Sequence, residues 1–192
     1  MINKRNIEQL KQLTRMGNVD SSPEYRVDGL IELIETVQLK NKRVCEIGCF
    51  RGVSTETFLQ YSPAEFYAVD IWGMNIDYHE CDWLGNLNFA NIEREFREMT
   101  TLYDNVHIIK NYSIDAAKLF SNNSLDLVYI DGEHTYEAVK NDIQSWLPKI
   151  SYGGYIAGHD YVQPQLKQAV CENFPIDKIK TFKDSSWLVR IN

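Results

Sequence analysis

The chain passes from a predicted strand into a predicted helix through Arg43-Val44-Cys45-Glu46-Ile47-Gly48-Cys49-Phe50-Arg51-Gly52. The mostly apolar start of this stretch leads into the pattern E-x-G-x-x-x-G, an acidic residue followed by two glycines. Glycines in such a turn let the backbone approach a ligand closely, and they leave N–H groups free at the start of the next helix. The stretch therefore predicts a strand, a ligand-binding turn and a helix, the basic unit of an open α/β sheet.

Strand and helix patterns alternate along the rest of the chain. They predict further strands over 66–70, 106–109, 125–130 and 153–158, and helices over about 54–61, 87–99, 114–120, 136–147 and 164–173. We expect Ser54 to cap its helix, and two helical stretches, about 4–16 and 23–39, to precede the first strand. Two short strands, about 178–183 and 186–191, flank the turn Asp184-Ser185 and imply a terminal antiparallel hairpin. The chain is thus expected to form one α/β domain over residues 1–192, with a seven-stranded, mostly parallel sheet.

The composition is that of an ordinary globular domain. The 192 residues include 20 Lys+Arg and 27 Asp+Glu, and the resulting net charge of −7 argues against nucleic acid as a partner. The sequence has no run of eighteen apolar residues and no signal-peptide pattern, so we expect a cytoplasmic protein without a membrane span. Four cysteines are sparse for a chain that can build its own core, so we expect reduced thiols.

Acidic residues follow several of the predicted strands. Glu46, Asp70, Asp131 and Asp160 all lie at or near strand carboxyl ends, which meet at the edge of an open α/β sheet where ligands bind. Any one of these acids could be a helix cap or a solvated turn residue. Four acids at one edge favour a ligand or cation site, because a carboxylate at a buried strand end needs a partner.

The spacing of the first turn points to a nucleoside. Asp70 follows Gly52 by eighteen residues, the separation at which an acid on the second strand can accept hydrogen bonds from ribose hydroxyls. Phe50 stands where the dinucleotide fingerprint needs its middle glycine, so a pyrophosphate is disfavoured. An NAD-dependent oxidoreductase therefore remains only an alternative.

Taken together, these residues resemble the class I S-adenosylmethionine-dependent methyltransferases, with Glu46 to Gly52 as the first motif. Asp131 to Tyr136, followed by Gly153 to Asp160, resembles the branch that contains macrolide-sugar O-methyltransferases and cephalosporin-hydroxylase-like proteins. The resemblance implies a Rossmann-like class I methyltransferase fold and S-adenosylmethionine as the cofactor. It places Glu46 at the methionine ammonium or a nearby backbone N–H, Gly48 and Gly52 at the close backbone approach, and Asp70 at the ribose. Ser113 would contact the adenine amino edge or, alternatively, cap a helix.

Two of the acids also suit a metal ion. Asp131 and Asp160 end adjacent predicted strands, so both carboxylates can reach one Mg²⁺ (or Mn²⁺). A bound cation would lower the pKa of an acceptor hydroxyl and hold its oxygen in line with the methyl group. His134 is placed to take the hydroxyl proton, or else bonds a neighbouring carbonyl, and His159 is a competing base or a histidine satisfied by the backbone.

The third metal ligand and the acceptor remain open. Tyr161 stands where catechol methyltransferases carry an Asn ligand, so Glu80 or Asp82 is a candidate replacement. Residues 72–86 are expected to form a lid, with Trp72 near the adenine and with Tyr78 and Trp83 over a sugar. Residues 1–41 would close the cofactor site or form a homodimer, with Arg5 on a solvated helix face.

The sequence thus predicts a metal-assisted O-methyltransferase that acts on a sugar, a glycan or another small hydroxyl-bearing acceptor. The alternatives are a catechol-like small-molecule O-methyltransferase, a hydroxylase-like member of the branch, an NAD-dependent oxidoreductase and a non-catalytic nucleoside-binding protein.

Overall fold

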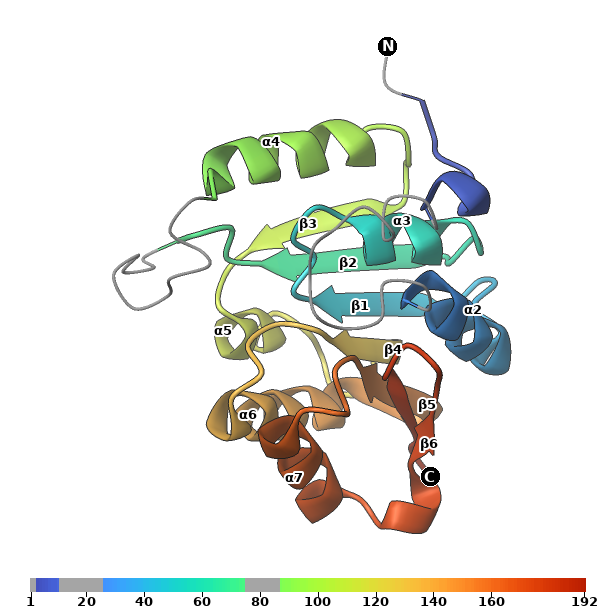
Figure 1. Cartoon of the computed structure of the whole chain (residues 1–192), viewed down its shortest axis with the longest axis vertical. Coiled ribbons are helices and arrows are strands. Elements are labelled where there is room, and N and C mark those ends of the chain that lie inside the picture. The colour runs from blue at the N-terminus through green and yellow to red at the C-terminus, as the bar shows by residue number, and fades with distance from the viewer. Residues whose placement is uncertain (1–2, 11–25, 75–86) are drawn as a thin grey trace.

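The computed structural model describes residues 3–10, 26–74 and 87–192, and its centre is a seven-stranded sheet (Figure 1). The strands are β1 (Arg43–Ile47), β2 (Glu65–Asp70), β3 (Val106–Lys110), β4 (Leu125–Ile130), β5 (Ile150–Gly158), β6 (Lys180–Thr181) and β7 (Trp187–Arg190). Their order across the sheet is β3-β2-β1-β4-β5-β7-β6. β1 to β5 pair in parallel, whereas β7 is antiparallel to both β5 and β6. The predicted fold class is therefore confirmed.

Helices cover both faces of this sheet. They are α2 (Arg26–Val37), α3 (Val53–Leu59), α4 (Phe89–Thr100), α5 (Ser113–Ala117), α6 (Tyr136–Trp146) and α7 (Pro164–Asn173), with short 3₁₀ turns at Leu147–Lys149 and Ile176–Lys178. Side chains on a strand alternate between faces, so Val44 packs in a core with α2, α3 and α4, and Cys45 packs in a second core with α5, α6 and α7. α6 and α7 lie side by side at the lower left of Figure 1.

The observed element boundaries correct some of the predicted ones. α7 covers the predicted residues, but β5 begins at Ile150, earlier than expected, and β6 is only two residues long. Ser54 does not cap α3. The cap residue is Gly52, with a φ of 79°, and the helix begins at Val53, one residue earlier than predicted. Glycine adopts this left-handed conformation without the steric strain of a Cβ.

The N-terminal segment is tethered to α3 by an ion pair. Glu56 of α3 is fully buried, and its two carboxylate oxygens accept hydrogen bonds from Arg5 N (2.8 Å) and Arg5 Nε (2.5 Å). Tyr103 donates to the same carboxylate from its hydroxyl at 3.2 Å. The prediction that Arg5 lies on a solvated face is therefore wrong, because the buried Glu56 carboxylate needs a cationic partner.

No helix within residues 3–10, 26–74 and 87–192 is both long and apolar enough to cross a membrane. Cys45, Cys49 and Cys171 are free thiols. The extent of the domain, the cytoplasmic location and the homodimer stay predictions.

Candidate active site at the carboxyl edge of the sheet

Asp70 fastens the turn after β1 to the end of β2. Its Oδ2 accepts hydrogen bonds from the backbone N–H groups of Cys49 and Phe50, both at 2.8 Å, and its Oδ1 accepts one from Trp72 N at 2.7 Å. An ionised carboxylate has about four lone-pair positions. Three N–H donors therefore leave Asp70 limited capacity for a ribose hydroxyl, unless the turn rearranges.

The two glycines of the turn are required by the packing of the protein itself. A Cβ at Gly48, where φ is 86°, would lie 2.2 Å from the backbone oxygen of Asp131. A Cβ at Gly52 would lie 2.6 Å from the methyl carbon of Met99. Gly48 thus brings the turn after β1 against the end of β4, where Asp131 lies.

Glu46 offers the clearest ligand signal in this turn. The side chain is fully buried, Oε2 accepts a hydrogen bond from Thr55 Oγ1, and Oε1 has no partner among the described residues. Burial, aided by the charge of Asp131, raises the pKa of Glu46 to about 8, against the lowering effect of the Ser54 and Thr55 hydroxyls. An orphaned buried oxygen is a place where an N–H or ammonium donor would bind favourably, so Glu46 fits the methionine end of the cofactor.

Trp72 lies in the core beneath the turn. Its side chain is 3% exposed, its ring centroid is 4.9 Å from that of Phe96, and its indole Nε1 donates to Phe50 O at 3.0 Å. The predicted contact of Trp72 with an adenine ring stays a prediction. The indole holds the turn in place from below.

Ser113 is bound within the protein. Its Oγ accepts a hydrogen bond from Trp146 Nε1 at 2.8 Å, and the same hydroxyl bonds the buried Asp142 carboxyl. The cap residue of α5 is Tyr112, so the predicted alternative of Ser113 as a cap is wrong. Burial, aided by the charge of Glu133, raises the pKa of Asp142 to about 6 against the lowering effect of Ser113.

Asp131, His134 and Asp160 meet at the carboxyl ends of β4 and β5. The two strands are parallel neighbours with Ile130 opposite Gly158, which brings the residues that follow them together. The His134 ring lies between the acids, with Nε2 3.5 Å from Asp131 Oδ1 and Nδ1 3.4 Å from Asp160 Oδ2. One ligand atom from each of the three residues lies within 4.8 Å of the others. We call these three residues the acid cluster.

The donor set of the acid cluster is compatible with a divalent cation. Two carboxylate oxygens suit Mg²⁺ or Mn²⁺, which fill their remaining positions with water. The imidazole of His134 is a candidate for the third ligand that the sequence lacked. Glu80 and Asp82, the predicted replacements, lie outside the described residues, as do Tyr78 and Trp83.

His159 lies behind the acid cluster among carboxylates. Its Nδ1 is 3.4 Å from Asp160 Oδ2 and 3.9 Å from Asp131 Oδ1, and its side chain is 8% exposed. Burial, the largest influence, lowers the pKa of His159, but Asp160, Asp131 and Asp184 together raise it to about 9. For His134, burial also lowers the pKa, and Asp131 and Asp160 together raise it above its ordinary value.

Sequence reasoning missed two residues beside this cluster. Gln163 Nε2 lies 3.2 Å from His134 Nδ1. Asp184 is buried in the C-terminal hairpin, and its oxygens accept hydrogen bonds from Ser186 N at 3.0 Å and Ser186 Oγ at 2.9 Å. The only sequence signals were an amide residue before Pro164 and an acid in a tight turn, and neither pattern is specific.

The hairpin also supports the loop that carries Asp160. Tyr161 N donates to Ser185 O at 2.9 Å. A Cβ at Gly29 of α2 would lie 2.1 Å from Asp184 Oδ1, so α2 packs directly against the hairpin. Asp160 itself has a left-handed φ of 58°, an uncommon conformation for a non-glycine residue that the surrounding contacts must hold.

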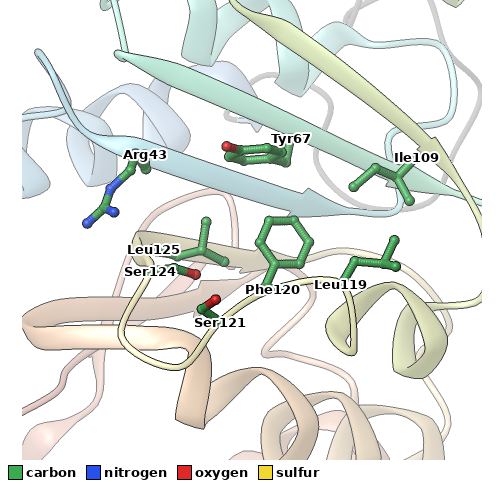
Figure 2. A pocket seen from close by; sticks show the side chains of 8 residues that line it. All are labelled: Arg43, Tyr67, Ile109, Leu119, Phe120, Ser121, Ser124 and Leu125. Atoms are coloured by element: carbon green, nitrogen blue, oxygen red, sulfur yellow. The ribbon is translucent and has the colours of Figure 1, made fainter.

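A pocket of about 300 Å³ lies away from these acids (Figure 2). Arg43 and Leu125, the first residues of β1 and β4, line it together with Tyr67, Phe120 and Ser124. Its lining contains none of the acids at the carboxyl edge, where ligands of open α/β sheets bind. We do not assign it to the candidate site.

Comparison with known sequences identifies the family. Residues 45–161 match a family model described as a methyltransferase domain. The uncharacterized protein R132 of Acanthamoeba polyphaga mimivirus is 29% identical over 154 residues, which cover 73% of this chain and 63% of that protein. The uncharacterized protein y4gI of Sinorhizobium fredii (strain NBRC 101917 / NGR234) is 29% identical over 136 residues, or 64% of this chain and 13% of that protein. The chain thus spans less than two thirds of either relative.

Solved structures share the fold. A SAM-dependent O-methyltransferase (TM0748) from Thermotoga maritima matches with a TM-score of 0.65 and 10% identity, over 97% of this chain and 71% of that one. The O-methyltransferase NovP matches with a TM-score of 0.60 and 18% identity, over 97% of this chain and 79% of that one. Identities this low establish the fold only.

The family match covers the turn after β1, Asp70 and the acid cluster, and the strand order is shared with methyltransferases of known structure. The chain therefore belongs to the methyltransferase-domain family and has the class I S-adenosylmethionine-dependent methyltransferase fold.

Proposed function

We propose that this protein is an S-adenosylmethionine-dependent O-methyltransferase in which Asp131 and Asp160 hold a divalent cation and His134 receives the acceptor proton. The observation that carries this proposal is the acid cluster, whose ligand atoms lie within 4.8 Å of one another. Gly48 packs against Asp131, so the cluster lies beside the turn that contains Glu46. A cofactor bound at that turn would have its methyl group close to an acceptor held at the cluster.

The turn and its neighbours would bind the cofactor. The orphaned Oε1 of Glu46 would accept a hydrogen bond from the methionine ammonium. Asp70 would offer its remaining acceptor capacity to the ribose, and its three backbone contacts would fix the turn meanwhile. Ser113 and Trp72 would act indirectly, because both are engaged with other parts of the protein.

Methyl transfer needs little more than alignment and the removal of one proton. The acceptor oxygen attacks the methyl carbon, a C–O bond forms, and the C–S bond breaks to leave S-adenosylhomocysteine. The hydroxyl proton passes to His134 Nε2, which is buried and has no hydrogen-bond partner among the described residues. A divalent cation, when bound, supplies a lower hydroxyl pKa and a fixed oxygen position.

The geometry favours His134 over His159 as the base. The His134 side chain as a whole is 30% exposed, although its Nε2 atom is buried, whereas the His159 side chain is 8% exposed. Against the lowering effect of burial, Asp160, Asp131 and Asp184 raise the pKa of His159 to about 9, which favours its protonated form at neutral pH. Its charge would instead balance the carboxylates around it.

A sugar or glycan is the proposed acceptor class, with a catechol-like diol as the alternative. Vicinal hydroxyls can displace two water ligands from one cation, which suits the paired acids. The side chains of Glu133 and Thr135, next to His134, are exposed and polar. Such a rim matches a polyol better than an apolar ring.

The test is a screen of nucleotide sugars, glycans and catechols for cofactor-dependent mass gain, with Mg²⁺, with Mn²⁺ and with EDTA. We expect one acceptor class to gain a methyl mass only when the metal is present. Asp160→Asn should lower the rate by at least 100-fold, while Asp177→Asn, at an exposed acid away from the cluster, should not. Transfer that withstands both EDTA and Asp160→Asn would show that the metal role is wrong.

A separate titration addresses the other functions. Tight binding of S-adenosylhomocysteine without binding of NAD would exclude the oxidoreductase. Cofactor binding without transfer to any acceptor would favour the non-catalytic alternative.

A further inference from the structure

Gln163 sits at the entrance to α7 with its backbone fixed on both sides. Its N–H donates to Asp160 O at 2.9 Å, and its carbonyl accepts from Lys167 N at 2.9 Å. Pro164, the first residue of the helix, has the constrained φ that favours this position. The backbone of Gln163 is therefore locked relative to Asp160 of the acid cluster.

The Gln163 side chain does not cap the helix that it precedes. Although Gln163 is the cap residue of α7, it makes no side-chain cap hydrogen bond. The carboxamide instead reaches across to His134, with Gln163 Nε2 3.2 Å from His134 Nδ1. This contact joins the loop after β5 to the residues after β4.

The two nitrogens of His134 have different surroundings. Nδ1 lies beside Gln163 and 3.4 Å from Asp160 Oδ2. Nε2 is buried, 3.5 Å from Asp131 Oδ1, and makes no hydrogen bond within the part of the chain that the structure describes. In a neutral imidazole one nitrogen donates and the other accepts, and the partner of one nitrogen decides the state of the other. The group bound to Nδ1 therefore controls what Nε2 can do.

We propose that Gln163 is a positioning residue that binds Nδ1 of His134 and so sets which ring nitrogen carries the proton and whether Nε2 presents a proton or a lone pair to the acid cluster. A carboxamide has a donor end and an acceptor end of nearly the same shape. When its nitrogen faces Nδ1, the imidazole proton lies on Nε2. When the carboxamide is turned by 180°, its oxygen faces Nδ1. Nδ1 then carries the imidazole proton, and the lone pair of Nε2 is free. Asp160, whose carboxylate only accepts, cannot serve both states.

The contact between Gln163 and His134 does not depend on the proposed function. The role given to Nε2, in contrast, rests on the proposed function. The inference is the same whether Nε2 takes a proton or binds a cation. Partners of this kind, which orient a functional histidine through its other nitrogen, typically change activity or metal affinity by about 10- to 100-fold when removed.

The first test reads the ring directly, without activity. The chain has four histidines, so a ¹⁵N-histidine-labelled sample gives few ring signals, and His134→Gln identifies those of His134. The spectra are recorded at high pH, where neutral rings report their tautomers. In Gln163→Leu the tautomer ratio of His134 should shift, and in Gln163→Glu the proton should lie on Nδ1, because a carboxylate can only accept it.

The control carries the same substitution elsewhere on α7. Gln168 bonds Glu172 on the exposed surface, so Gln168→Leu should leave the His134 signals unchanged. Unchanged signals of His107, which lies on β3 away from the acid cluster, show that each variant is folded. If the tautomer ratio of His134 is the same in the wild type, Gln163→Leu and Gln163→Glu, the proposal is wrong.

The second test uses kinetics on any acceptor found by the screen. Gln163→Leu should lower kcat by about 10- to 100-fold with an unchanged KM for the cofactor, and Gln163→Glu should recover most of that loss. Equal loss in Gln163→Leu and Gln163→Glu would overturn the positioning role. Should the wild type transfer no methyl group, the proposed function fails, and the tautomer measurement still decides the role of Gln163.

Discussion

Glu46 gives the cofactor site a measurable pH signature. Burial and the charge of Asp131 raise the pKa of its carboxyl to about 8, so the group is mostly neutral below that pH. A neutral carboxyl must lose its proton before it can pair with the ammonium of the cofactor. S-adenosylhomocysteine carries the same ammonium, so we expect its binding to release a proton and to tighten as the pH rises.

The size of the effect follows from the pKa of Glu46. With a pKa of about 8, roughly 1% of the groups are ionised at pH 6 and about half at pH 8. If only the ionised form pairs with the ammonium, the dissociation constant should fall by about 50-fold between these pH values, which corresponds to about 2.3 kcal/mol.

Isothermal titration calorimetry at pH 6, 7 and 8, in two buffers with different ionisation enthalpies, measures both the affinity and the proton release. Glu46→Gln should bind more weakly, with little dependence on pH. As a control, Glu98→Gln, which changes an exposed partner of Arg94, should show the same change of affinity with pH as the wild type. Equal wild-type affinity at pH 6 and pH 8, without proton release, would refute the pairing of Glu46 with the ammonium.

Three further predictions concern stability. The pKa of Asp142 rises from 3.8 to about 6 on folding, so its contribution to stability is present below pH 3.8 and lost as the pH rises through 6. Between pH 4 and pH 8 the free energy of unfolding of Asp142→Asn, measured in urea, should therefore rise relative to that of the wild type by up to about 3 kcal/mol. The same pH dependence of the free energy of unfolding in both proteins would contradict this. Gly48→Ala should lower the free energy of unfolding by about 2–4 kcal/mol, seen as a lower Tm, because its Cβ would lie 2.2 Å from Asp131 O and its φ is 86°. An unchanged Tm would show that the turn can move. Arg5→Met should cost about 2–3 kcal/mol in urea unfolding, since it leaves the buried Glu56 carboxylate without its cation; a loss below 0.5 kcal/mol would show that the tether is dispensable.

Local patterns were enough to predict the fold. Short, mostly apolar runs between helical patterns predicted the strands, and the acids after those strands lie at one edge because parallel strands share a direction. Asp131 and Asp160 could be paired from the sequence for the same reason, since their strands are neighbours. These inferences needed only periodicity and strand order.

The partners of single side chains could not be predicted in this way. Trp72 and Ser113 follow strands just as the acids do, yet Trp72 turns into the core beneath Phe50 and Ser113 binds Trp146 of α6. Their partners lie 22 and 33 residues away, and no local spacing encodes such contacts. The same limit hid Gln163, whose partner is 29 residues earlier.

The support that the C-terminal hairpin gives to the acid cluster has a consequence for biosynthesis. A nascent chain can form β1 to β4 while the hairpin is still inside the ribosome, but the Tyr161 to Ser185 hydrogen bond and the packing of Asp184 on Gly29 must wait for it. Domains generally fold as units during synthesis once their contacts become available. The order of translation thus delays assembly of the reactive edge until Asp184 and Ser185 have emerged.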